Sequence, residues 1–186
     1  LGGFGKWGLG AVSTSGDPLR QGFDAFFGYN CQAVAHNYYP THLWSNATRV
    51  ALNNPKFGAH QKLPAGADTN AAASYAKFSG NDYAPDLIGR QALSFLRDNQ
   101  ARPFFLYYPT TVPHLALQAP ADSLEEFAGR YPETPYPGGR GYLPHRMPRA
   151  AYAAMMTRMD REVGRVLQLI KEFGLEYYKR ATREII

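Results

Sequence analysis

A lysine near the start of the chain, Lys6, lies among glycines in the stretch GFGKWGLG. Gly3, Gly5 and Gly8 match the spacing of a dinucleotide-binding turn, which needs a buried strand before it and a helix after it. Only two residues precede Gly3, and the residues after Gly8 are turn formers that end at Pro18. The sequence therefore disfavours a dinucleotide site. It leaves an exposed lysine in a glycine-rich turn, or a lysine that binds another anion.

Two histidines are candidates to act with this lysine. His114 follows a proline in TTVPHLALQAP, and His36 lies among aromatic residues in CQAVAHNYYPTHLW. A lysine and two histidines suit a tetrahedral anion, because charged donors stabilise oxyanions and a histidine can carry a proton to a leaving oxygen. Taken singly, a histidine such as His114, beside a proline, is more often an ordinary loop residue than a catalyst. The chemistry therefore depends on whether the fold brings the three side chains together.

The central part of the chain carries the first clear elements. Residues 1–83 show little periodicity and many turn signals, which predicts loops and no strand. Apolar residues at helical spacing predict a helix over 85–98. The run PFFLYYP, 103–109, predicts a buried strand, parallel because a helix leads into it. His114 then follows the carboxyl end of that strand, where ligand sites of open α/β sheets gather.

A second, longer helix is predicted over 149–173. Its expected apolar stripe repeats every three or four residues and comprises Tyr152, Met155, Met159, Val163, Val166, Ile170 and Phe173. Gly174 lies where a helix C-cap belongs, and the methionines are expected to fill the core. The stretch YYKRATREII that follows is charged and irregular. The pattern predicts an α/β fold with a single strand, lacking further strands on both sides.

Composition limits the function classes. The net charge of +5 comes from scattered Lys and Arg residues, which argues against nucleic acid as a partner. No apolar run approaches the ~20 residues of a membrane span, and no signal peptide is visible. Cys31 is the sole cysteine, so neither an internal disulfide nor a cysteine-based zinc site is expected.

Four segments together resemble arylsulfatases of the type I, formylglycine-dependent sulfatase family. They are GFGKWGLG, QGFDAFFGYNCQAVAHNYYPTHLW, RPFFLYYPTTVPHLALQAP and AAYAAMMTRMDREVGRVL, in the family's order. The resemblance implies an alkaline-phosphatase-like three-layer α/β sandwich that hydrolyses sulfate esters with a formylglycine nucleophile and a calcium ion. It also implies that Lys6 and His114 contact the sulfate, as catalytic residues.

The chain departs from the family at several positions. Many members have a histidine where this chain has Gly8; His36, or less well Gln32, is expected to take its place as a substrate-binding residue. Cys31 lacks the nucleophile motif around it, and EYYKRATREII stands where a metal-binding D-N-G segment is expected. We therefore expect residues 1–186 to be part of a loop-rich sulfatase catalytic domain. It would hold neither the formylglycine site nor the calcium ligands, and would be inactive alone.

Two other functions remain open at this point. One is a metallohydrolase of the same superfold that acts on phosphate esters, which would be distinguished by a Thr or Ser nucleophile. The other is a non-catalytic module that holds sulfated glycans through Lys6, His114 and aromatic loops. The expected partner is a sulfated small molecule or glycan. The family implies a periplasmic, secreted or lysosomal-type compartment, and the oligomeric state is open.

Overall fold

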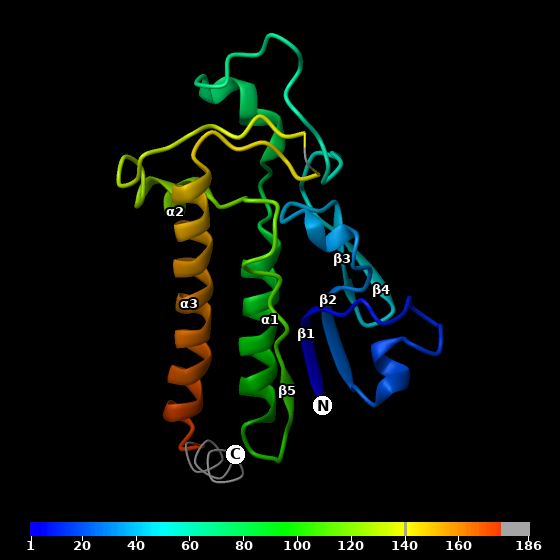
Figure 1. The fold of residues 1–186 in the computed structure, drawn as a ribbon. Helices are drawn as coiled ribbons and strands as arrows, with labels where there is room; N and C mark the ends of the chain where they lie inside the picture. The colour runs from blue at the N-terminus through cyan, green and yellow to red at the C-terminus, as the bar shows by residue number, and fades with distance from the viewer. Residues whose placement is uncertain (140, 176–186) are drawn as a thin grey trace, which may run out of the picture.

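The computed structural model describes residues 1–139 and 141–175 (Figure 1). The described elements are five strands, three α-helices and three short 3-10 helices. In chain order they are β1 (Gly2–Lys6), η1 (Pro18–Gln21), β2 (Ala25–Tyr29), η2 (Val34–His36), β3 (His42–Ser45), β4 (Thr48–Ala51), η3 (Ala72–Phe78), α1 (Ala84–Asn99), β5 (Leu106–Tyr107), α2 (Ala121–Glu125) and α3 (Pro148–Glu172).

The five strands form one mixed sheet in the order β4-β3-β2-β1-β5. β1 pairs in parallel with β2 on one side and with β5 on the other. β3 and β4 extend the sheet as an antiparallel hairpin. The α/β class is thus confirmed, and β5 is parallel as predicted, although it is shorter than 103–109. The prediction that this strand is buried is wrong, because β5 lies at the edge of the sheet, and Phe105 and Tyr107 are exposed. The expectation of a single strand is wrong.

Gly3 and Gly5 lie in a strand, β1, rather than in a turn, whereas Gly8 follows the strand. Gly5 in β1 and Gly28 in β2 face each other and both have positive φ, +145° and +153°. A side chain on Gly5 would overlap the carbonyl oxygen of Pro109, and one on Gly28 would overlap that of Gly5. The prediction of loops over residues 1–83 is therefore wrong for β1 to β4. These strands contain glycine because their backbones approach too closely for a Cβ, and glycine does not mark a strand in a sequence.

Both long helices lie on one side of the sheet. Figure 1 shows α1 between the sheet and α3, and α1 contacts β1, β2 and α3. α1 begins with Pro85 in its first turn, and α3 ends at Glu172, followed by Gly174, whose φ of +68° suits the predicted helix end. Both helices are confirmed to within one residue at each end. Residues 176–186 lie outside the described residues, so the expectation for that stretch is not addressed.

The apolar stripe predicted for α3 is only partly buried. Met155 is fully buried, as expected of core filler, but Tyr152 and Val163 are 47% and 40% exposed. Glu162, which the pattern puts on a polar face, is buried instead. The buried face of α3 instead includes the small side chains Ala151 and Ala154, which the predicted stripe left out.

The main core lies between the sheet and α1. It is built from Phe4, Phe27, Tyr29 and Leu43 of the strands, with Ile88 and Ala92 of the helix. The loop between β1 and β2 covers the other side of the sheet, where Phe23 packs edge-on against Trp7 and beside Tyr107 (Figure 1). Among the described helices, none is long and apolar enough to cross a membrane.

Candidate active site

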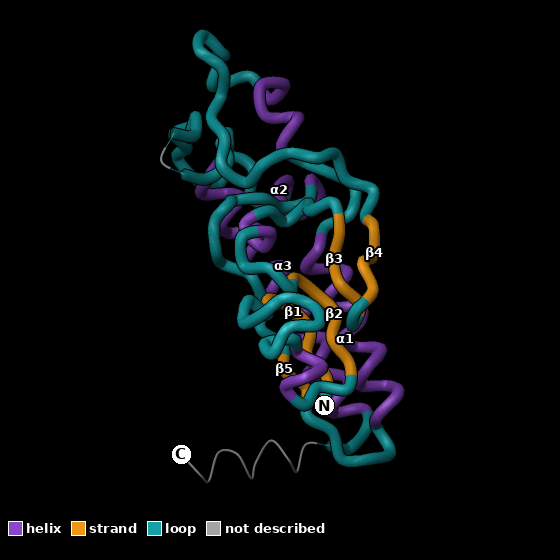
Figure 2. Tube along the Cα trace, turned by 90° about the vertical axis from the view of Figure 1, so that its right-hand side faces the viewer, coloured by secondary structure: helices purple, strands orange, loops and turns teal. Residues whose placement is uncertain are grey.

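The sheet topology gathers several loops at one edge. β1, β2 and β5 run parallel, so their carboxyl ends meet there. After β1 the chain moves to β2 on one side, and it later returns through α1 to β5 on the other. β1 is therefore the point at which the strand order reverses, where open α/β sheets place their ligand sites. Figure 2 shows the loops stacked above the strands, away from the N-terminus.

Lys6 is the last residue of β1 and is half-exposed at this edge. Its backbone is fixed on both sides: its N–H donates to the carbonyl of Pro109, and Trp7 N–H donates to that of Tyr29, each at 2.9 Å. The Trp7 ring packs against Phe23 and Phe26 and donates from Nε1 to the Gly16 carbonyl at 2.6 Å. The position of Lys6 is therefore set by the sheet and by the aromatic side chain that follows it.

His114 lies in the loop after β5, and a buried hydroxyl holds that loop. Tyr38, fully buried, points its hydroxyl at the carbonyls of Thr111 (2.9 Å) and His114 (2.7 Å). His114 N–H also donates to the Thr111 carbonyl at 2.9 Å. Burial raises the pKa of the Tyr38 hydroxyl, so it remains a donor. Through Tyr38 the loop after β5 is tied to the segment that follows His36.

His36 and His114 are brought into contact. Their rings stack with centroids 4.7 Å apart and planes 8° from parallel. The pKa of His36 is lowered, first by burial and then by the charges of His114, Lys6 and His60. Lys6 therefore acts electrostatically on the ring that stacks against His114. The structure gathers Lys6, His36 and His114 around one place; their roles in binding remain predictions.

Gln32 covers the backbone at Gly8. A Cβ on Gly8 would lie 3.4 Å from Oε1 of Gln32 and 3.5 Å from its Cβ. The side chain of Gln32 therefore occupies the space into which a side chain at position 8 would extend. Nearby, Gly8 N–H donates to the carbonyl of Asn30. The Asn30 side chain is buried, and its Nδ2 has no hydrogen-bond partner among the described residues. This edge thus offers amide groups beside the lysine.

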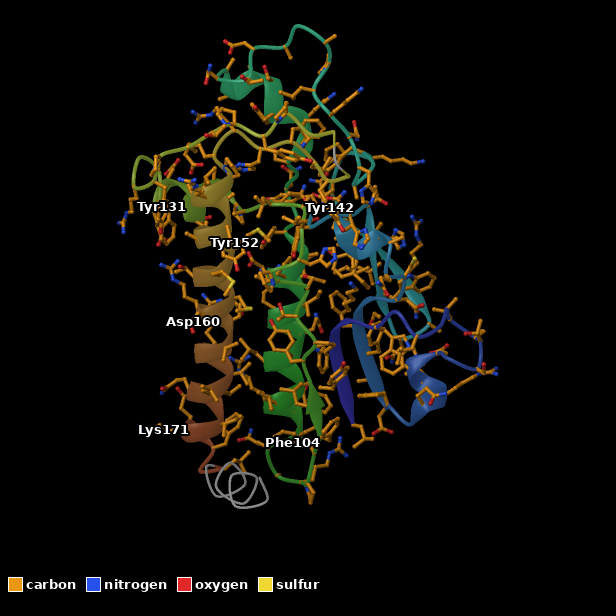
Figure 3. The ribbon with its side chains drawn as sticks, viewed as in Figure 1. Phe104, Tyr131, Tyr142, Tyr152, Asp160 and Lys171 are labelled. Carbon is orange, nitrogen blue, oxygen red and sulfur yellow. The ribbon has the colours of Figure 1, made fainter. Side chains whose placement is uncertain are left out.

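A third histidine, His60, joins the site and was missed in the sequence. Its Nε2 lies 3.3 Å from Nδ1 of His36, and its Nδ1 contacts the carbonyl of Gly141. The Tyr142 ring packs against His36, His60 and His114, at centroid distances of 5.6, 5.1 and 5.6 Å. Figure 3 shows Tyr142 near the upper end of the sheet. No motif marks His60, because it comes from a loop whose partner is about 80 residues away in sequence.

Two backbone pairings hold the loop of His60 against that of Gly141. Lys62 forms an antiparallel bridge with Gly138, and Leu63 N–H donates to the Pro137 carbonyl at 2.8 Å. Gly138 has a φ of +84°, and a Cβ there would lie 2.5 Å from the Gln61 carbonyl oxygen. Only glycine permits this approach. The place of His60 is therefore set by backbone contacts as well as by its own ring.

A cavity of about 600 Å³ lies elsewhere. It is lined by residues around the start of α1, by α2 and by α3, among them Tyr83, Asp86 and Arg158. None of the predicted site residues lines it. The Arg158 guanidinium is held by Asp86 at 2.6 Å and by Asp122 at 3.1 Å. It is therefore not free for an anion, and we place the candidate site at the histidines instead.

Comparisons with known proteins identify similar sequences and structures. The chain is 24% identical over 205 residues to an uncharacterized sulfatase of Schizosaccharomyces pombe, covering 91% of this chain and 35% of that protein. The crystal structure of Ps i-CgsB superposes with a TM-score of 0.60 at 21% identity, covering 93% of this chain and 34% of that one.

A further solved structure, from work on the metabolism of multiple glycosaminoglycans by Bacteroides thetaiotaomicron, gives a TM-score of 0.56 at 18% identity. It covers 94% of this chain and 40% of that one. The chain thus spans about a third of the length of the relatives that it matches. The family model named Sulfatase matches residues 2–177, nearly the whole chain. The chain therefore belongs to the sulfatase family.

Proposed function

We propose that the whole protein hydrolyses sulfate esters, and that this chain supplies the part of its anion site that contains Lys6 and His114. The observation that carries this proposal is the stack of His36 on His114 beside the charge of Lys6, at the sheet edge where strand order reverses. Membership of the sulfatase family supports the same chemistry.

The roles of the side chains follow from what they can donate. The Lys6 ammonium offers three N–H donors and a full positive charge to the sulfate oxygens. His114 contacts the carbonyl of Leu115 through Nδ1, which leaves Nε2 free to face a ligand. Protonated at Nε2, it would donate to a sulfate oxygen or to the oxygen of the departing alcohol. Gln32, above Gly8, is proposed to contribute a further amide contact.

The calcium ion and formylglycine implied by the family do not fit this part of the site. The groups gathered here are an ammonium, imidazoles, a phenol and amides, whereas calcium prefers several carboxylate and carbonyl oxygens. Within the described residues no group of three or more His, Cys, Asp or Glu side chains could hold a metal. We assign no step of the reaction to either group.

A sulfated glycan is the proposed class of substrate. One of the similar structures, Ps i-CgsB, is known in complex with k-i-k-neocarrahexaose, and that chain superposes on this one with a TM-score of 0.59. The half-exposed aromatic ring of Tyr142 at the site also suits a sugar face. The compartment, periplasmic, secreted or lysosomal-type, remains a prediction from the family.

The test is hydrolysis of a chromogenic aryl sulfate, and release of sulfate from sulfated oligosaccharides, by the whole protein. Lys6→Ala removes a charge-assisted contact worth about 1.5–3 kcal/mol, so kcat/KM should fall roughly 10- to 150-fold. Lys56→Ala is the matched control, because Lys56 is exposed in a loop and contacts none of the site residues named above. It should leave the rate unchanged.

The same assay separates the alternatives. Preferential turnover of an aryl phosphate would favour the phosphate-ester hydrolase. Binding of a sulfated oligosaccharide by calorimetry, lost in Lys6→Ala but without turnover of any ester, would favour the binding module. Equal activity of Lys6→Ala and Lys56→Ala would contradict the assignment of Lys6 to the anion site.

A further inference from the structure

A backbone carbonyl fixes the position of one proton in the histidine cluster. Nδ1 of His60 contacts the carbonyl oxygen of Gly141. A carbonyl oxygen can only accept a hydrogen bond, so Nδ1 of His60 must carry the hydrogen. A neutral imidazole has a single N–H, and Nε2 of His60 is therefore a bare acceptor.

That bare nitrogen decides the tautomer of His36. Nε2 of His60 lies 3.3 Å from Nδ1 of His36, and the two rings meet nearly at right angles, with an interplanar angle of 89°. Because His60 accepts, Nδ1 of the neutral His36 must donate. The single hydrogen of His36 is then used, and its Nε2 is bare. The order of donation is thus His36 to His60 to the Gly141 carbonyl.

The surroundings favour the neutral form of His36. The groups that face it are His114, stacked on its ring, the Lys6 ammonium, His60 and the Tyr142 ring. None of these groups carries a negative charge while the tyrosine is protonated. Burial and the positive charges lower the pKa of His36, which keeps its lone pair available at neutral pH.

We propose that the Gly141 carbonyl and His60 hold His36 in its Nδ1–H tautomer, so that His36 presents a bare Nε2 as a proton acceptor, with His60 as a positioning residue. A sulfate oxygen has no hydrogen to offer that nitrogen, whereas a water, a sugar hydroxyl or a hydroxyl nucleophile does. When His36 acts, the O–H bond breaks, an Nε2–H bond forms, and the electron pair stays on the oxygen. Lys6 and an N–H of His114 then hold the anion while His36 accepts the proton of the hydroxyl. This division of roles rests on the proposed function, whereas the tautomer of His36 follows from the contacts of His60 and is independent of that function.

The test is long-range proton–nitrogen correlation spectroscopy of the chain labelled with ¹⁵N-histidine, at a pH above the titration of its histidines. Substituting each histidine in turn assigns the signals. His36 and His60 should both show a protonated Nδ1 and a bare Nε2. In His60→Ala, His36 should lose this signature and shift toward the Nε2–H tautomer that free imidazole prefers. In His60→Gln, the amide oxygen can replace the acceptor, so His36 should keep Nδ1–H.

His42→Asn is the control, because His42 lies in β3 with Arg49 and Thr41 as its neighbours. It should leave the His36 signals unchanged. The proposal is overturned if wild-type His36 carries its proton on Nε2, or if His60→Ala leaves the tautomer as it was. These outcomes require no activity. An inactive whole protein with the expected tautomers would contradict the proposed function alone.

Discussion

At the scale of single residues, hydroxyl and carbonyl groups that contact the histidines or their loops fix the positions of the histidines. The Tyr38 hydroxyl shares one hydrogen between the carbonyls of Thr111 and His114. Tyr83 is a suitable control for Tyr38, because it is also buried and its hydroxyl donates to the carbonyl of Gln118 at 3.0 Å. The two tyrosines differ in which loop residue they hold, which allows the positioning effect to be separated from stability.

Tyr38→Phe and Tyr83→Phe should each lower the free energy of unfolding by about 1–2 kcal/mol, because the first removes the hydroxyl donor of the His114 carbonyl and the second that of the Gln118 carbonyl. Only Tyr38→Phe should weaken the ring contact between His36 and His114, measured as nuclear Overhauser effects between their ring protons. If both variants keep that contact at full strength, the Tyr38 hydroxyl does not position His114.

The candidate residues were predictable to different degrees. Lys6 and His114 were predicted from a family resemblance carried by local motifs. His36 and Gln32 were predicted because Gly8 stands where many members of the family have a histidine. His60 had no such signal, since its neighbours His36 and Gly141 lie 24 and 81 residues away. Its place depends on two loops that are far apart in the sequence and pair largely through backbone contacts. Such pairing leaves no periodicity in the sequence.

At the scale of elements, the helices were predictable because their periodicity is local. β1 and β2 were not, since their glycines serve a contact between backbones that is visible only when both strands are in place. The β3–β4 hairpin turns at Asn46, whose φ of +52° is a turn signal, but the strands beside it are only four residues each. The buried face of α3 was mistaken because alanines and Glu162 are buried in place of Tyr152 and Val163, which are exposed.

The helices offer a comparison between two arginines of α3. Arg158 binds Asp86 of α1 through two nitrogens at 2.7 and 2.6 Å, with both side chains 21% exposed. Arg161 binds Glu126 in the same two-pronged way at 2.7 Å, with side chains 50% and 37% exposed. The two pairs have similar geometry, but Arg158 is less accessible to solvent and also binds Asp122 and Ser123.

Arg158→Met should lower the free energy of unfolding by about 2–3 kcal/mol, because Asp86 is left half-buried and unpaired. Arg161→Met should cost less than about 1 kcal/mol, since water replaces an exposed partner. Methionine keeps the apolar stem in both variants, and urea unfolding gives both values. Equal losses would mean that burial does not control the strength of these pairs.

At the scale of the whole molecule, histidines in different surroundings serve different purposes. His36, His60 and His114 gather at the edge of the sheet, whereas His145 lies apart and lines the large cavity. His145 is held by backbone: it exchanges two hydrogen bonds with Tyr136, and its Nδ1 accepts from Met147 N–H at 3.0 Å. Burial lowers the pKa of His145 to about 4. It therefore remains neutral in the folded chain at pH values where an exposed histidine is charged.

This depressed pKa predicts how stability depends on pH. Above about pH 6.5 His145 is neutral in both states and contributes nothing to the pH dependence. As the pH falls from about 6.5 to about 4, the unfolded chain binds the proton first, so the folded state loses up to about 3 kcal/mol. His145→Asn keeps an acceptor for Met147 and removes the titration, so its unfolding free energy should fall less over this range. Urea unfolding at a series of pH values measures the difference. His42→Asn, at a half-exposed position, should reproduce little of it. Parallel curves for wild type and His145→Asn would show that His145 is not held neutral by the fold.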